Sequence, residues 1–203
     1  MFTGIVQAIG RIHAYEPHGA DARMVIDAGA LDLSDVAPGD SIAVDGVCLT
    51  AVALAPSQFT VDASAETLRC TRGFAPDGAV NLEKALRLAD RLGGHLMSGH
   101  VDGIGRVVAF EDLGGGSHRL AVEAPAALAR YIAGKGSVAI NGVSLTVNAI
   151  DGNRFEVNLI PHTLEMTTLR TLAPDQPVNL EIDLIARYVA RMAAHDVALS
   201  TSR

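Results

Sequence analysis

Two side chains able to act as nucleophiles occupy matching positions in two similar stretches of the sequence. Cys48 lies in DGVCLT, and Ser144 lies in NGVSLT. Thr50 and Thr146 follow two positions later, which places each on the same strand face as the thiol or hydroxyl before it. A thiol or hydroxyl can attack an electrophile, relay a proton or orient a water molecule. The alternative is a purely structural role, since small residues pack well in strands and Cys is often simply buried.

Two histidines, His95 and His100, stand close together in GGHLMSGHVDG. Imidazole is the natural proton carrier near neutral pH. A metal site is not expected, because no third ligand has suitable spacing and the chain contains no HExxH pattern. A single His also often has a purely structural role. We therefore expect proton transfer or orientation, rather than metal binding, from this segment.

The sequence contains an internal repeat that places these residues in two copies of one unit. FTGIVQAIGRI resembles MSGHVDGIGRV, and the same order holds for DGVCLT with NGVSLT, FTVDASAETL with FEVNLIPHTL, and VNLEKAL with VNLEIDL. The copies are separated by 95 to 98 positions, the larger value running from Val80 to Val178. A unit of this length is a compact domain rather than a solenoid repeat. We expect a duplicated domain with its boundary near Gly93 and Gly94.

Strand patterns dominate both copies. SIAVDGVCLTAV (41–52) and SVAINGVSLTVN (137–148) are β-branched runs interrupted by Asp-Gly or Asn-Gly, which favour two-residue hairpin turns. Further strands are expected at 58–63, 154–159, 80–83 and 178–183, and Gly114 to Gly116 predict a flexible loop. Many short strands separated by turns predict a small barrel or sandwich.

Helical patterns are short except at the end of the chain. Single helical turns are expected at 64–68 and 161–165, and a short helix at 124–133. The clearest helix runs from about Ile185 to Leu199. Its apolar seam spans two heptads and is formed by Ile185, Tyr188, Met192, His195 and Leu199. Such a seam fits either a coiled coil or a helix packed on its own domain.

Composition excludes several classes of protein. The 203 residues carry a formal net charge of −7, which argues against a nucleic-acid partner. The two cysteines, Cys48 and Cys70, form no disulfide framework and lack metal-type spacing. Neither a signal peptide nor an apolar run long enough to span a membrane is visible. We expect a soluble, cytoplasmic protein.

Several segments resemble the lumazine-binding repeats of the riboflavin synthase (alpha chain) family. They are MFTGIVQ, GVCLT, GVSLTV, the ETL that begins at Glu66, GGHLMSGHVDG and LIPHTLEMTTL. The resemblance runs from Met1 to about Ile185 and implies an all-β fold of two tandem six-stranded Greek-key barrels plus a C-terminal α-helix that builds a homotrimer. The implied domains are 1–95 and 96–185 for the two barrels and 186–203 for the trimerisation helix.

The resemblance also implies a reaction, the last step of riboflavin biosynthesis. Two molecules of 6,7-dimethyl-8-ribityllumazine exchange a four-carbon unit, which makes the enzyme a transferase. One molecule becomes riboflavin and the other becomes 5-amino-6-ribitylaminouracil. The family requires no cofactor and no metal. One substrate is expected on an N-terminal barrel and the other on the C-terminal barrel of a neighbouring subunit, so each site holds two lumazines. Which barrel holds the donor, and whether the enzyme associates with lumazine synthase, stay open.

The family pattern assigns catalytic roles to Cys48, Ser144, Thr146, His100, Asp183 and Ser41. His100 is expected as an acid, base or orienting group of the C-terminal barrel, and His95 as a structural residue. Asp183 is expected to polarise a neighbouring hydroxyl. Ser41 and its copy Ser137 open the hairpins, and on spacing alone Ser41 would be a solvated strand start.

The implied substrate-binding residues form two similar sets, one for each copy. The first set is Gly4, Ile5, Val6, Cys48, Leu49, Thr50, Asp62, Ala63, Ser64, Ala65, Glu66 and Thr67. The second is Gly99, His100, Val101, Lys135, Ser144, Leu145, Thr146, Ile160, Pro161, His162, Thr163, Leu164 and Glu165.

This sequence departs from the family pattern at Asp45, where Asn is more usual, and at Ala63 and Ala65, which thin the ribityl-side wall.

Three other functions compete with the synthase. A lumazine-type optical protein would hold a chromophore without turnover and would lose the polar set. An oligonucleotide-binding barrel would need basic faces with exposed aromatics. A structural trimerisation module would not need matched polar pockets.

Overall fold

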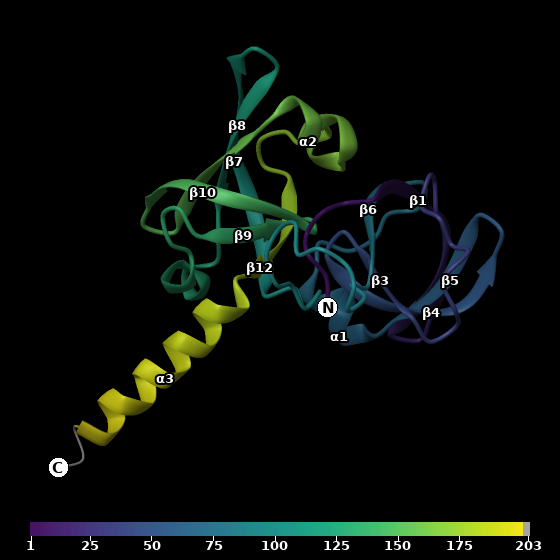
Figure 1. Cartoon of the computed structure of the whole chain (residues 1–203), viewed down its shortest axis with the longest axis horizontal. Coiled ribbons are helices and arrows are strands. Elements are labelled where there is room, and N and C mark those ends of the chain that lie inside the picture. Colours follow the sequence, from purple (N-terminus) through teal and green to yellow (C-terminus); the bar gives the residue numbers. More distant parts are fainter. Residues whose placement is uncertain (201–203) are drawn as a thin grey trace.

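The computed structural model describes residues 1–200 and, for residues 196–200, the backbone alone. The chain forms two closed six-stranded barrels, and a long helix extends away from them (Figure 1). All strand pairs are antiparallel. The expected all-β fold of two six-stranded barrels plus a C-terminal helix is therefore confirmed.

The N-terminal barrel consists of the first six strands in the order β1-β2-β5-β4-β3-β6. A short helix, α1 (Ala65–Cys70), follows the fifth strand. The strand bounds are β1 (Ala8–His18), β2 (Asp21–Asp27), β3 (Ser41–Val44), β4 (Val47–Ala55), β5 (Gln58–Ala63) and β6 (Ala79–Lys84).

The C-terminal barrel repeats this arrangement. Its strands follow the same cyclic order when they are numbered from its own first strand, which confirms the duplication. Its helices are η1 (Ala126–Tyr131), α2 (Pro161–Met166) and η2 (Thr168–Thr171), of which η1 and η2 are 3₁₀ helices. The strand bounds are β7 (Gly103–Gly114), β8 (Ser117–Glu123), β9 (Ser137–Ile140), β10 (Val143–Asp151), β11 (Arg154–Leu159) and β12 (Pro177–Ile182).

The two predicted hairpin turns lie where the barrels meet. Asp45 and Gly46 have φ of 49° and 78°, and Asn141 and Gly142 have 46° and 78°, as a two-residue hairpin turn requires. A Cβ on Gly46 would lie 2.7 Å from the backbone nitrogen of Gly142. Glycine is thus needed both for the positive φ and for the contact between the two turns.

Each barrel has its own aliphatic core, and a third, smaller cluster joins them. Strand alternation buries residues such as Leu49 in the first barrel and Leu145 in the second. The third cluster contains Phe2 and Met97, together with Ala43 and Ala139 from the outer faces of the barrels. The barrels are therefore joined by a thin apolar layer that is separate from their cores.

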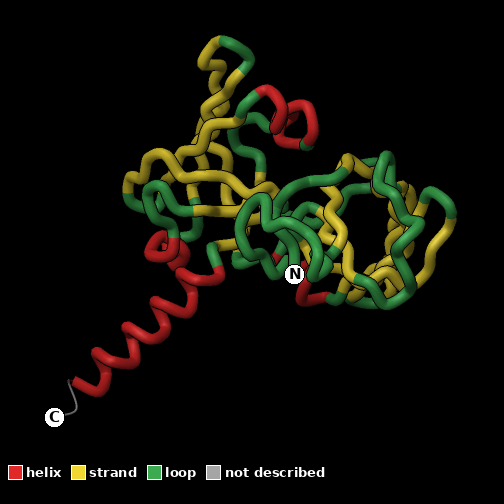
Figure 2. Tube along the Cα trace, in the orientation of Figure 1, coloured by secondary structure: helices red, strands yellow, loops and turns green. Residues whose placement is uncertain are grey.

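The start of each repeat crosses over to the other barrel. Phe2 and Met97 form an antiparallel bridge, with N···O distances of 2.8 and 3.1 Å. Beyond it, the backbone N–H of Ser144 donates to Gly4 at 2.8 Å, and that of Cys48 donates to Gly99 at 2.8 Å. We call residues 2–6 and 97–101 the crossing segments. They lie in loop between the barrels (Figure 2).

Two buried glutamates hold the crossing segments in place. The Glu83 carboxylate accepts the backbone N–H groups of Thr3 at 2.7 Å and Gly4 at 2.9 Å. Glu181 does the same for Ser98 at 2.6 Å and Gly99 at 3.0 Å. Burial raises the pKa of both carboxyl groups, and these hydrogen bonds lower it.

Two asparagines build a polar contact between the barrels with matching hydrogen bonds. Asn81 donates from Nδ2 to the carbonyl of Asn141 at 2.8 Å and accepts the N–H of Thr168 at Oδ1, also at 2.8 Å. Asn179 donates in the same way to the carbonyl of Asp45 at 3.0 Å. Both amides are buried, so each hydrogen bond satisfies a group that water does not reach.

Asp45 has a charged partner. Its carboxylate is 1% exposed, forms an ion pair with Arg72 and accepts the N–H of Asn81 at 2.9 Å. Burial raises its pKa, whereas Arg72 and this hydrogen bond lower it. The equivalent position in the second repeat is the neutral Asn141. Arg72 therefore offsets the buried charge of Asp45.

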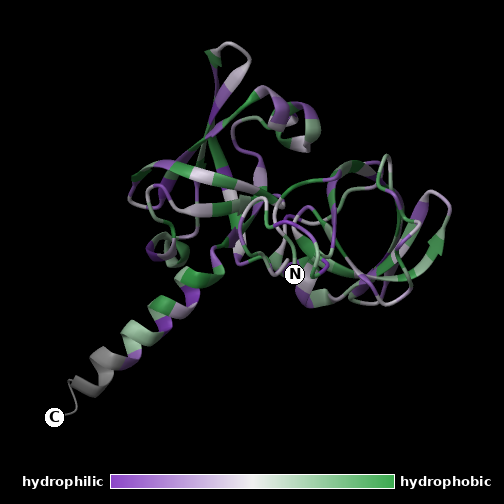
Figure 3. Cartoon of the chain, in the orientation of Figure 1, coloured by the Kyte–Doolittle hydropathy of each residue, from purple (hydrophilic) through white to green (hydrophobic). Residues whose placement is uncertain are grey.

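Helix α3 (Leu184–Ser200) confirms the predicted tail helix. Ile185, Tyr188 and Met192 are 63%, 63% and 68% exposed, so this part of the seam is not covered by the chain's own barrels. Figure 3 shows hydrophobic and hydrophilic residues along the helix. The side chain of Leu199 and residues 201–203 of the expected 186–203 domain lie outside the described residues. Within the described residues, no helix is long and apolar enough to cross a membrane.

The contact between the barrels predicts the effect of Asn81→Ala. The substitution leaves the carbonyl of Asn141 and the N–H of Thr168 without partners, so the free energy of unfolding should fall by about 1–3 kcal/mol. Denaturant unfolding measures this, with Asn148→Ala on an exposed position of β10 as the control. Equal stability of Asn81→Ala and the unchanged chain would contradict the structural role of this amide.

Candidate functional site

The candidate nucleophiles lie on the outer faces of the barrels. On β4, Cys48 is half-buried and Thr50 is exposed, while Leu49 between them points into the core. On β10, Ser144 and Thr146 are placed in the same way. Each pair therefore shares a strand face, as predicted, and that face can meet a ligand from outside the barrel.

The first group of candidate residues belongs to the N-terminal barrel. Cys48 and Thr50 lie on β4, and Ser41 on β3 pairs in register with Thr50. The crossing segment covers Cys48 so closely that a Cβ on Gly99 would lie 2.7 Å from the Cβ of Cys48. His100, next in this segment, is exposed. Its assignment to the C-terminal barrel is therefore wrong, because the crossing carries it to the N-terminal one.

The second group belongs to the C-terminal barrel. A Cβ on Gly4 would lie 2.6 Å from the Cβ of Ser144, so the first crossing segment covers Ser144 as the second covers Cys48. Val6 then packs against the core of this barrel. Lys135 is exposed, and its backbone N–H donates to Val147 of β10 at 2.8 Å, which places it beside this strand.

His95 contacts Ser144. Its Nδ1 lies 2.7 Å from Ser144 Oγ, and the side chain is mostly buried. Burial lowers the pKa of the imidazole, while the nearby charge of Asp183 raises it. The expectation of a purely structural His95 missed this contact. The resemblance of GGHLMSGHVDG to FTGIVQ does not extend to His95, so the repeat offered no signal for it.

Asp183 stands between β12 and α3. Its carboxylate accepts the N–H of Ile185 at 2.9 Å and so caps the start of the helix. It directly follows β12 of the C-terminal barrel, the barrel that carries Ser144, and its charge raises the pKa of His95. The corresponding residue of the first repeat, Ala85, donates its backbone N–H to Ser41 at 3.1 Å and carries no charge. The two groups therefore differ in their ionisable side chains.

The walls beside each group are formed by β5 with α1 and by β11 with α2. Asp62 forms two hydrogen bonds of 2.8 Å with Arg23, and Glu66 is bound to Arg69 at 2.9 Å. Ser64 caps α1 by accepting the N–H of Thr67. The wall positions with exposed side chains are Asp62, Ser64, Ala65, Glu66, Ile160, Pro161, His162 and Glu165, while Thr67, Thr163 and Leu164 are partly buried.

Three expected substrate-binding side chains are directed into barrel cores. Leu49, Ala63 and Leu145 are buried and belong to the aliphatic clusters. A ligand on the outer face can meet only the backbone of these residues. The structure corrects a side-chain role for all three, because strand alternation turns them away from the face that carries Cys48 and Ser144.

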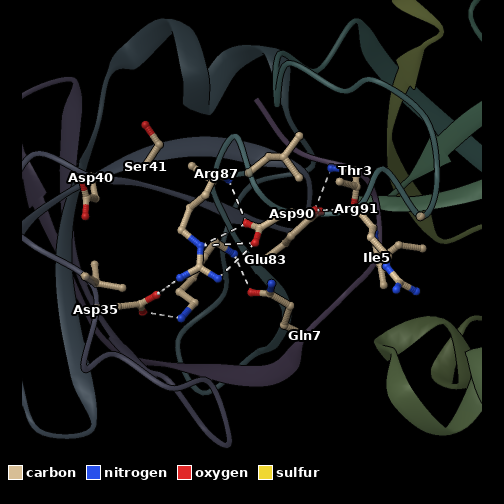
Figure 4. A pocket seen from close by; sticks show the side chains of 15 residues that line it. Thr3, Ile5, Gln7, Asp35, Asp40, Ser41, Glu83, Arg87, Asp90 and Arg91 are labelled. Carbon is tan, nitrogen blue, oxygen red and sulfur yellow. Dashed lines mark hydrogen bonds and ion pairs between the residues drawn. The ribbon is translucent and has the colours of Figure 1, made fainter.

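A cavity of about 600 Å³ opens beside Ser41 and Ile5 (Figure 4). Lys84, Asp35 and Arg87, which the sequence patterns did not indicate as site residues, line one side of this cavity. Lys84 donates to the Asp35 carboxylate at 2.5 Å, and Arg87 lies 3.1 Å from the same carboxylate. Lys84 stands in VNLEKAL where the second repeat has Ile182, and that difference was the available signal. Among the other candidate residues, Asp62 lines a second cavity of about 390 Å³.

Within one chain, the candidate catalytic residues thus form two separate groups. Ser41, Cys48 and His100 belong to the N-terminal barrel. Ser144, Thr146 and Asp183, with His95 in contact, belong to the C-terminal one. Among the side chains that the structure describes, those of residues 1–195, no three His, Cys, Asp or Glu are grouped in a way that could hold a metal ion.

Comparison with known proteins identifies the repeat. The model of the lumazine binding domain matches residues 3–85 and again 98–183. The riboflavin synthase of Photobacterium leiognathi is 46% identical over 198 residues, which cover 97% of this chain and 90% of that protein. The riboflavin synthase of Mycobacterium tuberculosis is 46% identical over 200 residues, with 95% and 98% covered. That of Brucella abortus is 43% identical over 202 residues, with 96% and 99% covered.

Solved structures of LumP share the fold. LumP complexed with 6,7-dimethyl-8-(1'-D-ribityl) lumazine superposes with a TM-score of 0.80 at 25% identity, covering 90% of this chain and 99% of that one. The riboflavin complex of LumP gives a TM-score of 0.81 at 27% identity with the same coverage. With two matched domains and synthase relatives aligned over nearly the whole length, the chain belongs to the lumazine-binding domain family and, within it, to the riboflavin synthases.

Proposed function

We propose that this chain catalyses the dismutation of two 6,7-dimethyl-8-ribityllumazine molecules to riboflavin and 5-amino-6-ribitylaminouracil. The observation that carries the proposal is the presence of two matching outer faces, one with Cys48 and one with Ser144, each covered by a crossing segment. Two identical substrates call for two similar sites. The difference between a thiol and a hydroxyl gives the two copies different tasks in one reaction.

The ligands of LumP support the class of substrate. LumP has been solved with the ribityllumazine and with riboflavin, and the present chain has the same fold. We place one bicyclic ring against each outer face, beside Cys48 in one barrel and beside Ser144 in the other. The ribityl chain would extend toward the polar residues of α1 or α2.

The proposal includes a homotrimer in which each active site lies between two subunits. Its support is the separation of the two residue groups within one chain and the exposure of the α3 seam. A neighbouring subunit would bring its Ser144 group opposite the Cys48 group of the first. Helix α3, which extends beyond the barrels, would provide the contact between copies (Figure 1).

The chemistry depends mostly on orientation. Holding two flat rings in a reactive arrangement is worth about 7–11 kcal/mol of the barrier. General acid–base help contributes a further 10²- to 10⁴-fold in typical enzymes. Hydroxyls, one thiol and two imidazoles are physically adequate for a reaction with this requirement.

Both cysteines are free, which fits the reducing cytoplasm that we propose as the location. Association with lumazine synthase remains a prediction.

A chromophore-binding protein is the second candidate, and the fold shared with LumP favours it. Two observations favour the enzyme instead. The curated synthases are 39–46% identical, whereas LumP is 25–27% identical. The polar residues Cys48, Ser144 and Asp183 are also all present.

Turnover is the direct test of this function. Purified protein mixed with 6,7-dimethyl-8-ribityllumazine and a chelator should produce riboflavin, followed by its absorbance. One riboflavin should form for every two lumazines consumed. Tight binding without riboflavin would favour the chromophore-binding candidate, and the absence of both binding and turnover would contradict the proposal as a whole.

The trimer is tested on the α3 seam. The unchanged chain should sediment at about three times 21.1 kDa. Tyr188→Glu places a charge on the exposed seam, so it should yield monomers and lose turnover, since the site then lacks its second half. Ala194→Glu, which places the same charge on an exposed position of the same helix away from the seam, should remain trimeric. A trimeric and active Tyr188→Glu variant would contradict the role of α3.

Phe2 tests the crossing segments. Its ring is fully buried between the barrels, and a Cβ on Gly99 would lie 2.9 Å from it. Phe2→Ala should lower kcat/KM by about tenfold to a hundredfold, because it displaces the segment that covers Cys48. The variant should stay folded, since Phe2 belongs to neither barrel core.

Phe74→Ala is the matched control, because Phe74 lies in the core of the N-terminal barrel and outside the crossing segments. It should lower the melting temperature but leave kcat/KM of the folded protein within about twofold. If Phe2→Ala kept the kcat/KM of the unchanged chain, the crossing segments would not position the site.

A further inference from the structure

The contact between His95 and Ser144 has a direction that the positions of the heavy atoms alone do not show. Nδ1 and Oγ are 2.7 Å apart, so one of the two groups donates a proton and the other accepts it. The direction matters because a serine hydroxyl that donates its proton to a base can be activated as a nucleophile. A serine that accepts keeps its own proton for another partner. The inference drawn below rests on the proposed function.

The surroundings of His95 distinguish the two cases. Its side chain is 8% exposed, and Nε2 is buried without a hydrogen-bond partner among the described residues. If the ring proton were on Nε2, a buried N–H would be left unsatisfied, which is rare and costly. If the proton is on Nδ1, it is used in the hydrogen bond to Ser144, and only a lone pair is left at Nε2. The second tautomer avoids the larger cost.

Burial also favours the neutral form of the ring. Burial is the larger influence on the pKa of His95 and lowers it, while the charge of Asp183 raises it to a smaller extent. A neutral imidazole with its proton on Nδ1 has no lone pair available toward Ser144. It therefore cannot remove the hydroxyl proton of Ser144 in this arrangement.

We infer that His95 is a positioning residue that donates from Nδ1 to Ser144 Oγ and so directs the Ser144 hydroxyl proton toward the substrate. Ring nitrogens and carbonyl oxygens of a lumazine are hydrogen-bond acceptors, and this hydroxyl would donate to one of them. Such a donor withdraws electron density from the ring and stabilises negative charge that develops there. No proton passes between His95 and Ser144, so Ser144 acts as a hydrogen-bond donor to the substrate rather than as a nucleophile.

The first repeat has no equivalent pair. Cys48 occupies the Ser144 position, and a thiol is only a weak hydrogen-bond donor. Ala85 stands at the position of Asp183. The hydroxyl that is held by a buried imidazole therefore belongs to the C-terminal barrel, which gives its ring a different electronic environment from the ring on the N-terminal barrel.

The first experiment locates the proton. The full chain, labelled with ¹⁵N in its histidines and free of ligand, is measured at neutral pH by two-dimensional NMR of the imidazole rings. The His95 signal, identified by its loss in His95→Asn, should show a proton on Nδ1. Its shift should change in Ser144→Ala. A proton on Nε2, or on both nitrogens, would overturn the inference.

The second experiment uses two isosteric variants that differ in hydrogen-bonding ability. Asn at position 95 can donate near the site of Nδ1, whereas the Asp carboxylate can only accept. His95→Ala should lower kcat by about tenfold. His95→Asn should recover most of that loss, and His95→Asp should not. Equal recovery by both would mean that position 95 accepts from Ser144, which would contradict the proposal.

A third measurement covers the case in which His95→Asp fails to fold. In a Ser144→Ala background, His95→Ala should cause little further loss of kcat, because both act through one hydroxyl. Independent, additive losses would show that His95 does not act through Ser144. The NMR result does not depend on turnover. A chain with the proton on Nδ1 but no riboflavin production would therefore refute the proposed function and leave the assignment of the pair intact.

Discussion

The antiparallel bridge between Phe2 and Met97 is the contact on which the arrangement of both candidate sites depends. It lies where the two crossing segments meet, in an apolar cluster that belongs to neither barrel core. From this point each segment continues onto the other barrel, where its glycine covers Cys48 or Ser144. The N–H groups of both segments are held by buried carboxylates. A change at the bridge would therefore alter two outer faces at once, although each barrel would keep its own core.

Duplication followed by divergence explains the chemistry better than either repeat does alone. The barrels have the same strand order and the same hairpin turns, so they present the same face to a ligand. The differences are concentrated on a few side chains. Ser144 has the buried His95 beside it. The C-terminal barrel also carries Asp183, where the N-terminal barrel has the uncharged Ala85. Two similar surfaces with different hydrogen-bonding groups are what a reaction between two identical molecules in different roles requires.

Local patterns in the sequence predicted much of the fold. The strands at 58–63 and 154–159 and both two-residue hairpin turns were predicted because they depend on alternation and on positive φ. The long strands β1 and β7 were not, since their second halves lose the alternation of buried residues. The exchange of crossing segments is a tertiary feature with no local pattern. For that reason His100 was assigned to the wrong barrel, and the contact between His95 and Ser144 was missed.

The central claim is that each chain carries two ring-binding faces, one on each barrel. Isothermal titration with a 7-oxo-8-ribityllumazine tests it most directly, because this molecule keeps the bicyclic ring and the ribityl chain but lacks the 7-methyl group and so cannot react further. Two molecules should bind per chain, with different affinities because the faces carry a thiol and a hydroxyl. Saturation at one molecule per chain, or at none, would contradict it.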